Sequence, residues 1–128
     1  MTTDQDEGAV SLRPPTATAD APEVYAAYGV AGYYGEVIPL LRLRLADGGW
    51  RAFAYYGLGE AAYDPALGIE LTFQAAVVCL RGRNLLPLYS LVCDHAVRWV
   101  WEADRAADLG SAESDTVVVR IEVGGPKG

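Results

Sequence analysis

The 128-residue chain has little of what most catalytic and metal sites are made from. It has one histidine, His95, and two cysteines, Cys79 and Cys93. Thirteen residues separate the cysteines, unlike the close-paired ligands of zinc sites, and on a helix Cys93 and His95 point in different directions. No glycine loop of the P-loop type is present. The sequence therefore predicts a protein that is not an enzyme, with no catalytic residue, no metal site and no cofactor.

The chain also lacks long apolar runs. No stretch is long enough to cross a bilayer, and the N-terminal residues are acidic and contain no apolar core of an export signal. We therefore expect a cytoplasmic protein with no membrane partner. The two cysteines lie in apolar stretches, so we expect them to be reduced core residues.

Positive charge is scarce as well. The formal net charge is −7, and the only lysine is Lys127. Carboxylates are concentrated in residues 1–35 and 103–115, whereas residues 36–102 hold six arginines against seven acids. Negative charge repels phosphate backbones within a screening length of about 8 Å at physiological salt. Nucleic acid is thereby disfavoured as a partner.

Composition divides the chain into three parts. Residues 1–24 are rich in Thr, Asp, Ala and Pro, which predicts a disordered acidic tail. Residues 25–123 are predicted to form a single globular domain, because a chain of this length with 52% hydrophobic residues supports one core. Residues 124–128 are expected to be a flexible tail.

Strand patterns dominate the first half of the domain. In residues 37–46 leucines alternate with Arg42 and Arg44, and the following Asp-Gly-Gly predicts a hairpin into a strand over 50–56. A second hairpin is expected to turn at 64–68. After Gln74 apolar residues no longer occupy only alternate positions, which indicates a bulge or a strand buried on both faces.

A helix and two more strands are predicted in the second half. Asn84 is a suitable N-cap, and Pro87 falls in the first turn of a helix running from about Asn84 to Ala96. Its apolar stripe consists of Leu85, Leu88, Tyr89, Val92 and Ala96. The two strands are expected to place alternate residues on one face, namely Val97, Trp99 and Trp101 in one and Val117, Val119, Ile121 and Val123 in the other. The predicted fold class is α+β, mainly β: a coiled antiparallel sheet or open small β-barrel with one packed or capping helix.

The chain is rich in Tyr and Trp, more than a small core can bury with every O–H and N–H paired. Such residues are favoured at protein interfaces. The leading hypothesis is a non-catalytic binding or assembly module that self-associates, or binds a protein partner, through an aromatic sheet face or edge strand. The candidate interface residues are Tyr33, Tyr34, Trp50, Tyr55, Trp99 and Trp101. The alternative is a large one-sided core whose tyrosine hydroxyls reach water.

Arginines suggest a second hypothesis, a small β-barrel that binds phosphate or nucleic acid. Arg81, Arg83 and Asn84 precede the predicted helix, whose free N–H groups favour an anion. Arg42 and Arg44 share a strand face, and Arg51 is expected beside them across the hairpin, where aromatic neighbours are available for stacking. The structural alternatives are an Asn-capped turn with two solvated arginines, and a solvent-facing sheet surface on which arginines pair with acids such as Glu36 and Glu70.

A third hypothesis is an enzyme or small-molecule binder with a pocket between the helix and the sheet. It requires polar groups to converge in an apolar cavity. The candidates are Glu60, Glu70 and His95.

Overall fold

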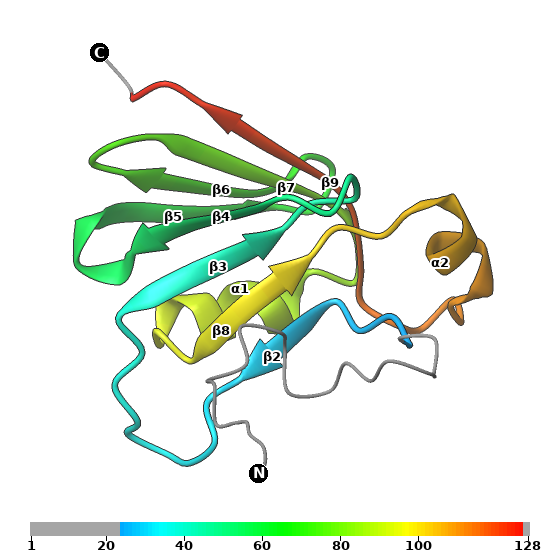
Figure 1. Ribbon diagram of the computed structural model, residues 1–128, viewed down its shortest axis with the longest axis horizontal. Coiled ribbons are helices and arrows are strands. Elements are labelled where there is room, and N and C mark those ends of the chain that lie inside the picture. The colour runs from blue at the N-terminus through cyan, green and yellow to red at the C-terminus, as the bar shows by residue number, and fades with distance from the viewer. Residues whose placement is uncertain (1–23, 127–128) are drawn as a thin grey trace, which may run out of the picture.

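The computed structural model describes residues 24–126, which form two packed β-sheets with short helices (Figure 1). The tails predicted at 1–24 and 124–128 therefore fall largely outside the described residues. One sheet has the strand order β2 (Tyr28–Val30), β8 (Val97–Trp101), β3 (Leu40–Arg44), β4 (Trp50–Ala54). The other has the order β5 (Leu58–Asp64), β6 (Gly68–Phe73), β7 (Val77–Arg83), β9 (Val117–Gly124).

This arrangement confirms the α+β, mainly β, fold class. The described strands form two four-stranded sheets rather than one continuous sheet, and an isolated bridge between Glu102 and Val118 links them. One strand pair is also parallel, since β8 lies beside β3 and runs in the same direction. Long connections bring these two strands together, and the alternation within each strand carries no information about its distant neighbour.

Both predicted hairpins are present. Between β3 and β4 the Leu45 N–H donates to the Gly49 carbonyl at 2.8 Å, and Gly48 supplies the left-handed backbone with φ +93°. Between β5 and β6 a carboxylate oxygen of Asp64 accepts the N–H groups of Ala66 and Leu67. These local contacts follow directly from the turn residues.

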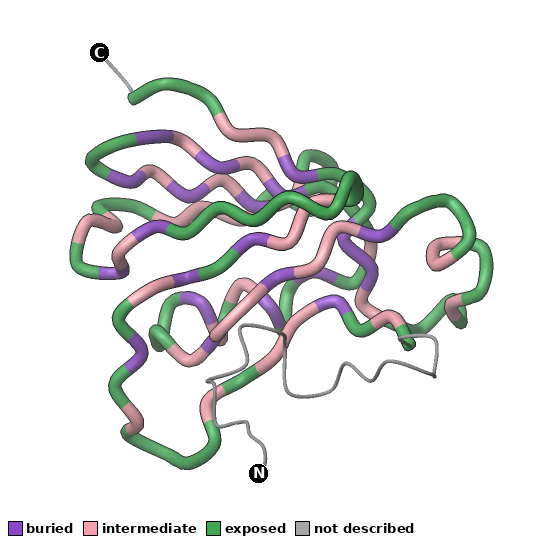
Figure 2. The backbone as a smooth tube through the Cα atoms, viewed as in Figure 1, coloured by how far each residue is buried: buried purple, intermediate pink, exposed green. Residues whose placement is uncertain are grey.

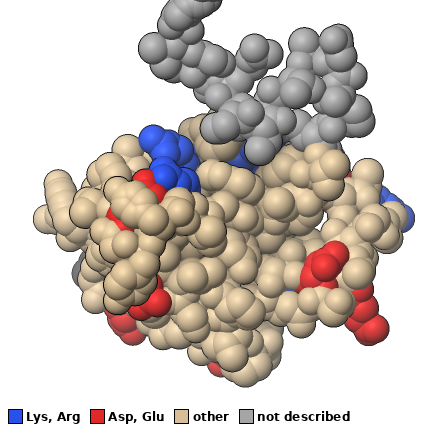
Figure 3. Space-filling view, turned by 90° about the horizontal axis from the view of Figure 1, so that it is seen from below, with Lys and Arg blue, Asp and Glu red and all other residues tan. Residues whose placement is uncertain are grey.

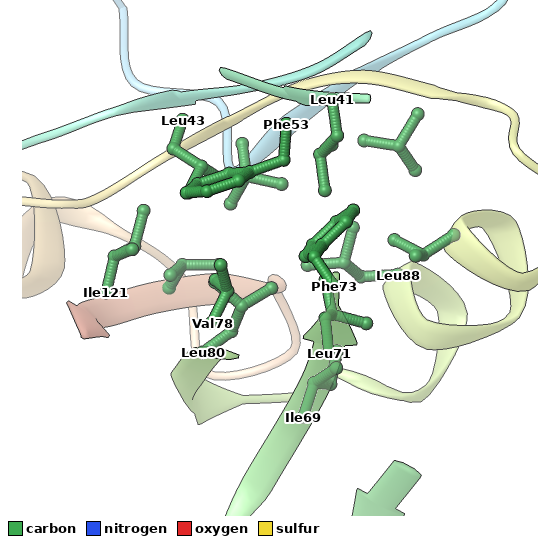
Figure 4. Close-up of a cluster of buried hydrophobic side chains, with 14 of the residues drawn as sticks. Leu41, Leu43, Phe53, Ile69, Leu71, Phe73, Val78, Leu80, Leu88 and Ile121 are labelled. Carbon is green, nitrogen blue, oxygen red and sulfur yellow. The ribbon is translucent and has the colours of Figure 1, made fainter. Parts of the chain in front are cut away.

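The core lies between the two sheets. Figure 4 shows the inward side chains of both sheets directed at one another, and Figure 2 shows buried positions along the strands. Phe53 of β4 stacks on Phe73 of β6, with ring centroids 5.1 Å apart. The remaining buried contributors from the sheets include Leu41, Leu43, Ile69, Leu71, Val78, Leu80 and Ile121.

Three irregularities change which side chains of the strands face the core, compared with the predicted alternation. The stretch after Phe73 is neither a bulge nor a doubly buried strand; it is a turn closed by the Phe73 N–H donating to the Ala76 carbonyl at 2.8 Å. A register shift between β7 and β9 leaves Val119 39% exposed. Another shift between β2 and β8 accompanies the complete burial of Val97 together with Val100, while Trp99 and Trp101 are only half-buried.

Helix α1 (Leu86–Cys93) is shorter than the predicted 84–96. Its N-cap residue is Leu85 and no side chain caps it, so the N-cap prediction for Asn84 is wrong; Asn84 instead adopts a left-handed backbone with φ 56°. At the other end, His95 has φ 55° and the chain leaves the helix. Leu85, Leu88 and Val92 of the predicted stripe are buried, and α1 contacts β5 of one sheet and β8 of the other.

Smaller elements complete the description. A 3₁₀ turn η1 (Tyr55–Gly57) joins the two sheets, and a short helix α2 (Arg105–Gly110) projects beside them (Figure 1). Asp104 caps α2 by accepting the Ala107 N–H at 2.8 Å. Cys79 and Cys93 are not joined in a disulfide, and Cys93 is exposed and Cys79 intermediate, which corrects their expected place in the core. Over residues 24–126, none of the helices has the length and apolarity needed to span a membrane.

Glu102 and Tyr25 tie the two sheets together beyond the core. The Glu102 carboxylate accepts the Ala46 N–H at 2.9 Å and the Ile121 N–H at 2.8 Å. The Tyr25 hydroxyl donates to the Trp101 carbonyl at 2.9 Å and accepts the Val118 N–H at 3.0 Å. Each of these side chains therefore links β9 to the sheet that contains β8.

Candidate binding face

The outward face of the β2-β8-β3-β4 sheet collects two arginines and three tryptophans. In the parallel β3–β8 pair, Arg42 is opposite Trp99 and Arg44 is opposite Trp101. In the antiparallel β3–β4 pair, Arg44 is opposite Trp50. Residues opposite one another on neighbouring strands point to the same side of a sheet. We call this set, Arg42, Arg44, Trp50, Trp99 and Trp101, the Trp–Arg face.

The Arg44 guanidinium is the centre of this face. Its Cζ atom lies 4.1 Å from the ring centroid of Trp101 and 5.9 Å from that of Trp50, within the range of cation–π attraction. Trp50 is 45% exposed, Arg42 is exposed, and Trp99 and Trp101 are half-buried. The indoles thus present apolar surface to the outside next to guanidinium groups.

Neighbouring residues hold two of the indoles in place. A Cβ atom added to Gly29 would lie 2.3 Å from the Trp99 ring, so only glycine at this position lets the indole lie across β2. The Tyr25 ring is 5.1 Å from the Trp101 ring, and the Tyr25 hydroxyl is held by backbone groups. Burial raises the pKa of this hydroxyl. Sequence reasoning missed the supporting roles of Tyr25 and Gly29, because they depend on the pairing of β2 with β8.

Arg51 does not belong to this face, contrary to the prediction. It is opposite Leu43, whose side chain is completely buried on the inner side of the sheet. The Arg51 guanidinium lies 5.4 Å from the ring centroid of Phe53, on that same inner side. The hairpin register therefore separates Arg51 from Arg42 and Arg44.

Tyr55 is also wrongly predicted as an interface residue, since it is only 3% exposed and is part of the core. Its hydroxyl donates to the Val97 carbonyl at 2.7 Å, and its ring stacks on His95 with 4.5 Å between centroids. Burial raises the pKa of Tyr55 well above its ordinary value. Tyr55 therefore anchors the end of α1 to β8.

Tyr33 and Tyr34 are exposed, as expected of interface residues, but they lie apart from the Trp–Arg face. They line a groove of about 590 Å³ together with Val37, His95 and other residues of the 31–38 loop and the end of α1. Figure 3, seen from below the view of Figure 1, shows a face on which uncharged side chains make up most of the visible surface.

An ion pair braces the loop that forms this groove. Glu36 pairs with Arg98, and the Gly32 N–H donates to the other carboxylate oxygen at 2.7 Å. The pKa of Glu36 lies below its ordinary value, chiefly because of the Gly32 N–H and then because of Arg98. Arg98 thus has a structural partner.

The residues of the proposed anion site are engaged by the protein itself. Arg81 contacts Glu122 at 3.5 Å and the Leu67 carbonyl at 3.4 Å, whereas Arg83 pairs with Asp108 of α2 at 2.5 Å. The Asn84 amide donates to the Glu113 and Asp115 carbonyls at 2.9 and 2.8 Å, so the three side chains diverge. This geometry favours a structural role, the attachment of the α2 region to β7.

The polar groups of the third hypothesis are not brought together. Glu70 lines a hollow of about 330 Å³ with Cys79 and Arg81, whereas His95 lines the groove beside the 31–38 loop. Glu60 is exposed on β5 and lines neither. Within the described range, His, Cys, Asp and Glu side chains form no group of three or more that could hold a metal ion.

Comparisons with family models, curated proteins and solved structures give no match to this chain. The geometry of the Trp–Arg face is therefore the basis for a functional proposal.

Proposed function

We propose that the protein is a non-catalytic protein-binding module whose Trp–Arg face receives an acidic, extended segment of its partner. The observation that carries this proposal is the pairing of β3 with β8, which places Arg42 and Arg44 opposite Trp99 and Trp101 on an outward sheet face. Tryptophan and arginine are the residue types most enriched among the residues that dominate binding energy at protein interfaces.

The chemistry of the face suits carboxylates beside apolar groups. A guanidinium stacked on an indole, as Arg44 is on Trp101, keeps its N–H donors in its own plane, where they can pair with a carboxylate. An indole contributes a large apolar contact area with few rotatable bonds. A partner segment that alternates acidic and aromatic or aliphatic residues would use both properties.

Two other occupants fit the face less well. A twofold pairing of two copies through this face would bring the same patch of each copy together, with Arg42 and Arg44 near their symmetry mates. A nucleic acid would meet a chain of net charge −7, and the loss of Arg51 from the face leaves a basic surface of only two arginines.

The test is a titration of the full chain with a Trp-free peptide of alternating Glu and Tyr, followed by tryptophan emission. All three tryptophans of the chain belong to the Trp–Arg face, so a change in emission reports on this surface. Replacing both face arginines, Arg42→Ala with Arg44→Ala, should raise the Kd about tenfold or more, because charge-assisted contacts are lost.

The matched control is the double variant Arg81→Ala with Arg120→Ala, which removes the same charge from the other sheet. Arg81 and Arg120 both pair with Glu122. The Kd of this control variant for the peptide should stay within about twofold of the Kd of the unmodified protein, far less than the tenfold change expected for the face variant. Equal weakening by both double variants, or no binding at all, overturns the proposal. A dimer that dissociates as the peptide binds would assign the face to a second copy instead, and tighter binding of a single-stranded oligonucleotide would assign it to nucleic acid.

A further inference from the structure

We infer that the chain carries a ligand for its own Trp–Arg face: the acidic segment of residues 1–23, which binds there in cis and competes with the partner. This inference rests on the proposed function, because both use the same face. It adds an internal regulator that an external partner must displace.

The segment has the chemistry that the face selects. Its charged residues are five carboxylates and one arginine, a net charge of −4, namely Asp4, Asp6, Glu7, Asp20, Glu23 and Arg13. Three prolines, at 14, 15 and 22, favour an extended backbone over a helix. It is therefore an acidic segment with extended preferences, opposite in sign to Arg42 and Arg44.

The described chain begins at the border of the face. Val24 is 87% exposed, and the ring of the next residue, Tyr25, is 5.1 Å from that of Trp101. The Arg44 guanidinium lies over the same indole at 4.1 Å. Residues 1–23 therefore join the fold next to the two arginines rather than at a distant edge.

The distances allow the nearest acids to reach the arginines. An extended chain covers about 3.3 Å per residue, so the backbone of Asp20 can lie up to about 17 Å from Tyr25. Neighbouring strands are about 4.8 Å apart, and crossing from β8 over β3 to β4 takes about 10 Å. Both Asp20 and Glu23 are within reach of the face.

Tethering favours this segment over the same segment of a second copy. A short connection to the fold gives an intramolecular ligand an effective concentration on the order of millimolar, so even weak contacts keep the face partly occupied. The apparent affinity for an external partner then falls in proportion to the fraction of faces that remain unoccupied by the segment.

The experiment compares two double variants of the full chain that remove the same charge. Asp20→Asn with Glu23→Gln weakens the segment, whereas Glu60→Gln with Glu113→Gln removes two exposed carboxylates elsewhere. Acrylamide quenching of tryptophan emission measures access to the face. We expect the first variant to raise the quenching constant about twofold and the second to leave it unchanged. The expected change is small because exposed ion pairs each contribute little free energy. Salt near 1 M, where the screening length is about 3 Å, should raise quenching of the unmodified chain similarly.

Titration with the Glu–Tyr peptide separates this inference from the proposed function. Tighter peptide binding by Asp20→Asn with Glu23→Gln, and not by the control, supports the inference. Equal quenching and equal peptide Kd for both variants overturn it while the proposed function stands. If neither the unmodified chain nor either double variant binds the peptide, the proposed function is overturned. Acrylamide quenching by itself then decides whether the segment covers the face. Quenching of the unmodified chain that falls with rising protein concentration would assign the segment to a neighbouring copy and overturn binding in cis.

Discussion

Tyr55 and Tyr56 are adjacent in the sequence, yet Tyr55 is 3% exposed and Tyr56 is 85% exposed. The difference follows from η1, which turns the chain between the two sheets and directs only Tyr55 into the core. Arg44 and Arg51 differ in the same way, since one stacks on Trp101 outside the sheet and the other lies over Phe53. Side-chain direction therefore separates buried Tyr55 from exposed Tyr56, and Arg44 on the Trp–Arg face from Arg51 on the other side of the same sheet.

Replacing Tyr55 by Phe should cost about 1 kcal/mol of stability near neutral pH, because the Val97 carbonyl loses a buried donor. Burial raises the folded-state pKa of Tyr55 above the ordinary tyrosine value of about 10. The folded chain thus holds this proton more tightly than the unfolded chain, and the corresponding stability is lost as the pH rises above about 10. Urea unfolding at neutral and alkaline pH should show the stability gap between wild type and variant closing at high pH.

The control for this pH dependence is Tyr56→Phe, which should unfold like the wild type at every pH because Tyr56 is exposed. A Tyr55→Phe chain that loses stability with pH as steeply as the wild type would show that ionisation of Tyr55 is not linked to unfolding.

Glu102 provides a second test at the residue scale, since its carboxylate accepts N–H groups from Ala46 and Ile121. Glu102→Ala should lower the free energy of unfolding by about 2 kcal/mol, because a charged acceptor for two backbone donors is lost. Glu102→Gln retains one acceptor oxygen and should lose less. Glu122→Ala is the control: its pairs with Arg81 and Arg120 are exposed and should contribute under about 1 kcal/mol. Equal losses in all three variants, measured by urea unfolding, would refute the bridging role.

At the scale of elements, the sequence predicts what is local and misses what depends on pairing. The Asp-Gly-Gly hairpin, the Asp64 turn and the buried stripe from Leu85 to Val92 follow from nearby residues. The positions of Val97 and Val119 do not, because each depends on a register shift set by a partner strand. One extra residue in a strand reverses the facing of all residues beyond it.

Gly82 marks the irregularity between β7 and β9 and can be tested directly. A Cβ atom at this position would lie 1.9 Å from the Val117 carbonyl oxygen, a backbone atom that cannot move without separating the two strands. Gly82→Ala should therefore destabilise the protein by about 3 kcal/mol, as overpacking does. Gly124→Ala, on the same strand pair with open space around it, should change stability by less than about 1 kcal/mol. Thermal unfolding of both variants decides between crowding and a general effect of losing glycine.

At the scale of the molecule, the candidate face also divides into predictable and unpredictable parts. Alternation in residues 40–44 places Arg42 and Arg44 on one side of a strand, and the richness in tryptophan indicates a binding surface. The joining of these features requires β8 to lie parallel to β3, although the connection between them passes through β4, three strands of the second sheet (β5, β6 and β7) and α1. Such non-local pairing has no signature in either strand alone.

The continuous core predicts that the two sheets unfold together. Tryptophan emission reports only on the β2-β8-β3-β4 sheet, whereas far-UV circular dichroism reports on both. The two probes should give the same urea midpoint and slope, since the buried side chains of both sheets form one cluster.

A variant in the second sheet sharpens this test. Leu71→Ala truncates a completely buried side chain of β6, so it should lower stability by about 2–5 kcal/mol and shift both probes equally. If Leu71→Ala shifts circular dichroism but leaves the tryptophan transition in place, the sheets unfold as separate units. The Trp–Arg face would then sit on a sheet that is stable without the other. A common shift means that any mutation weakening the second sheet also weakens the binding face.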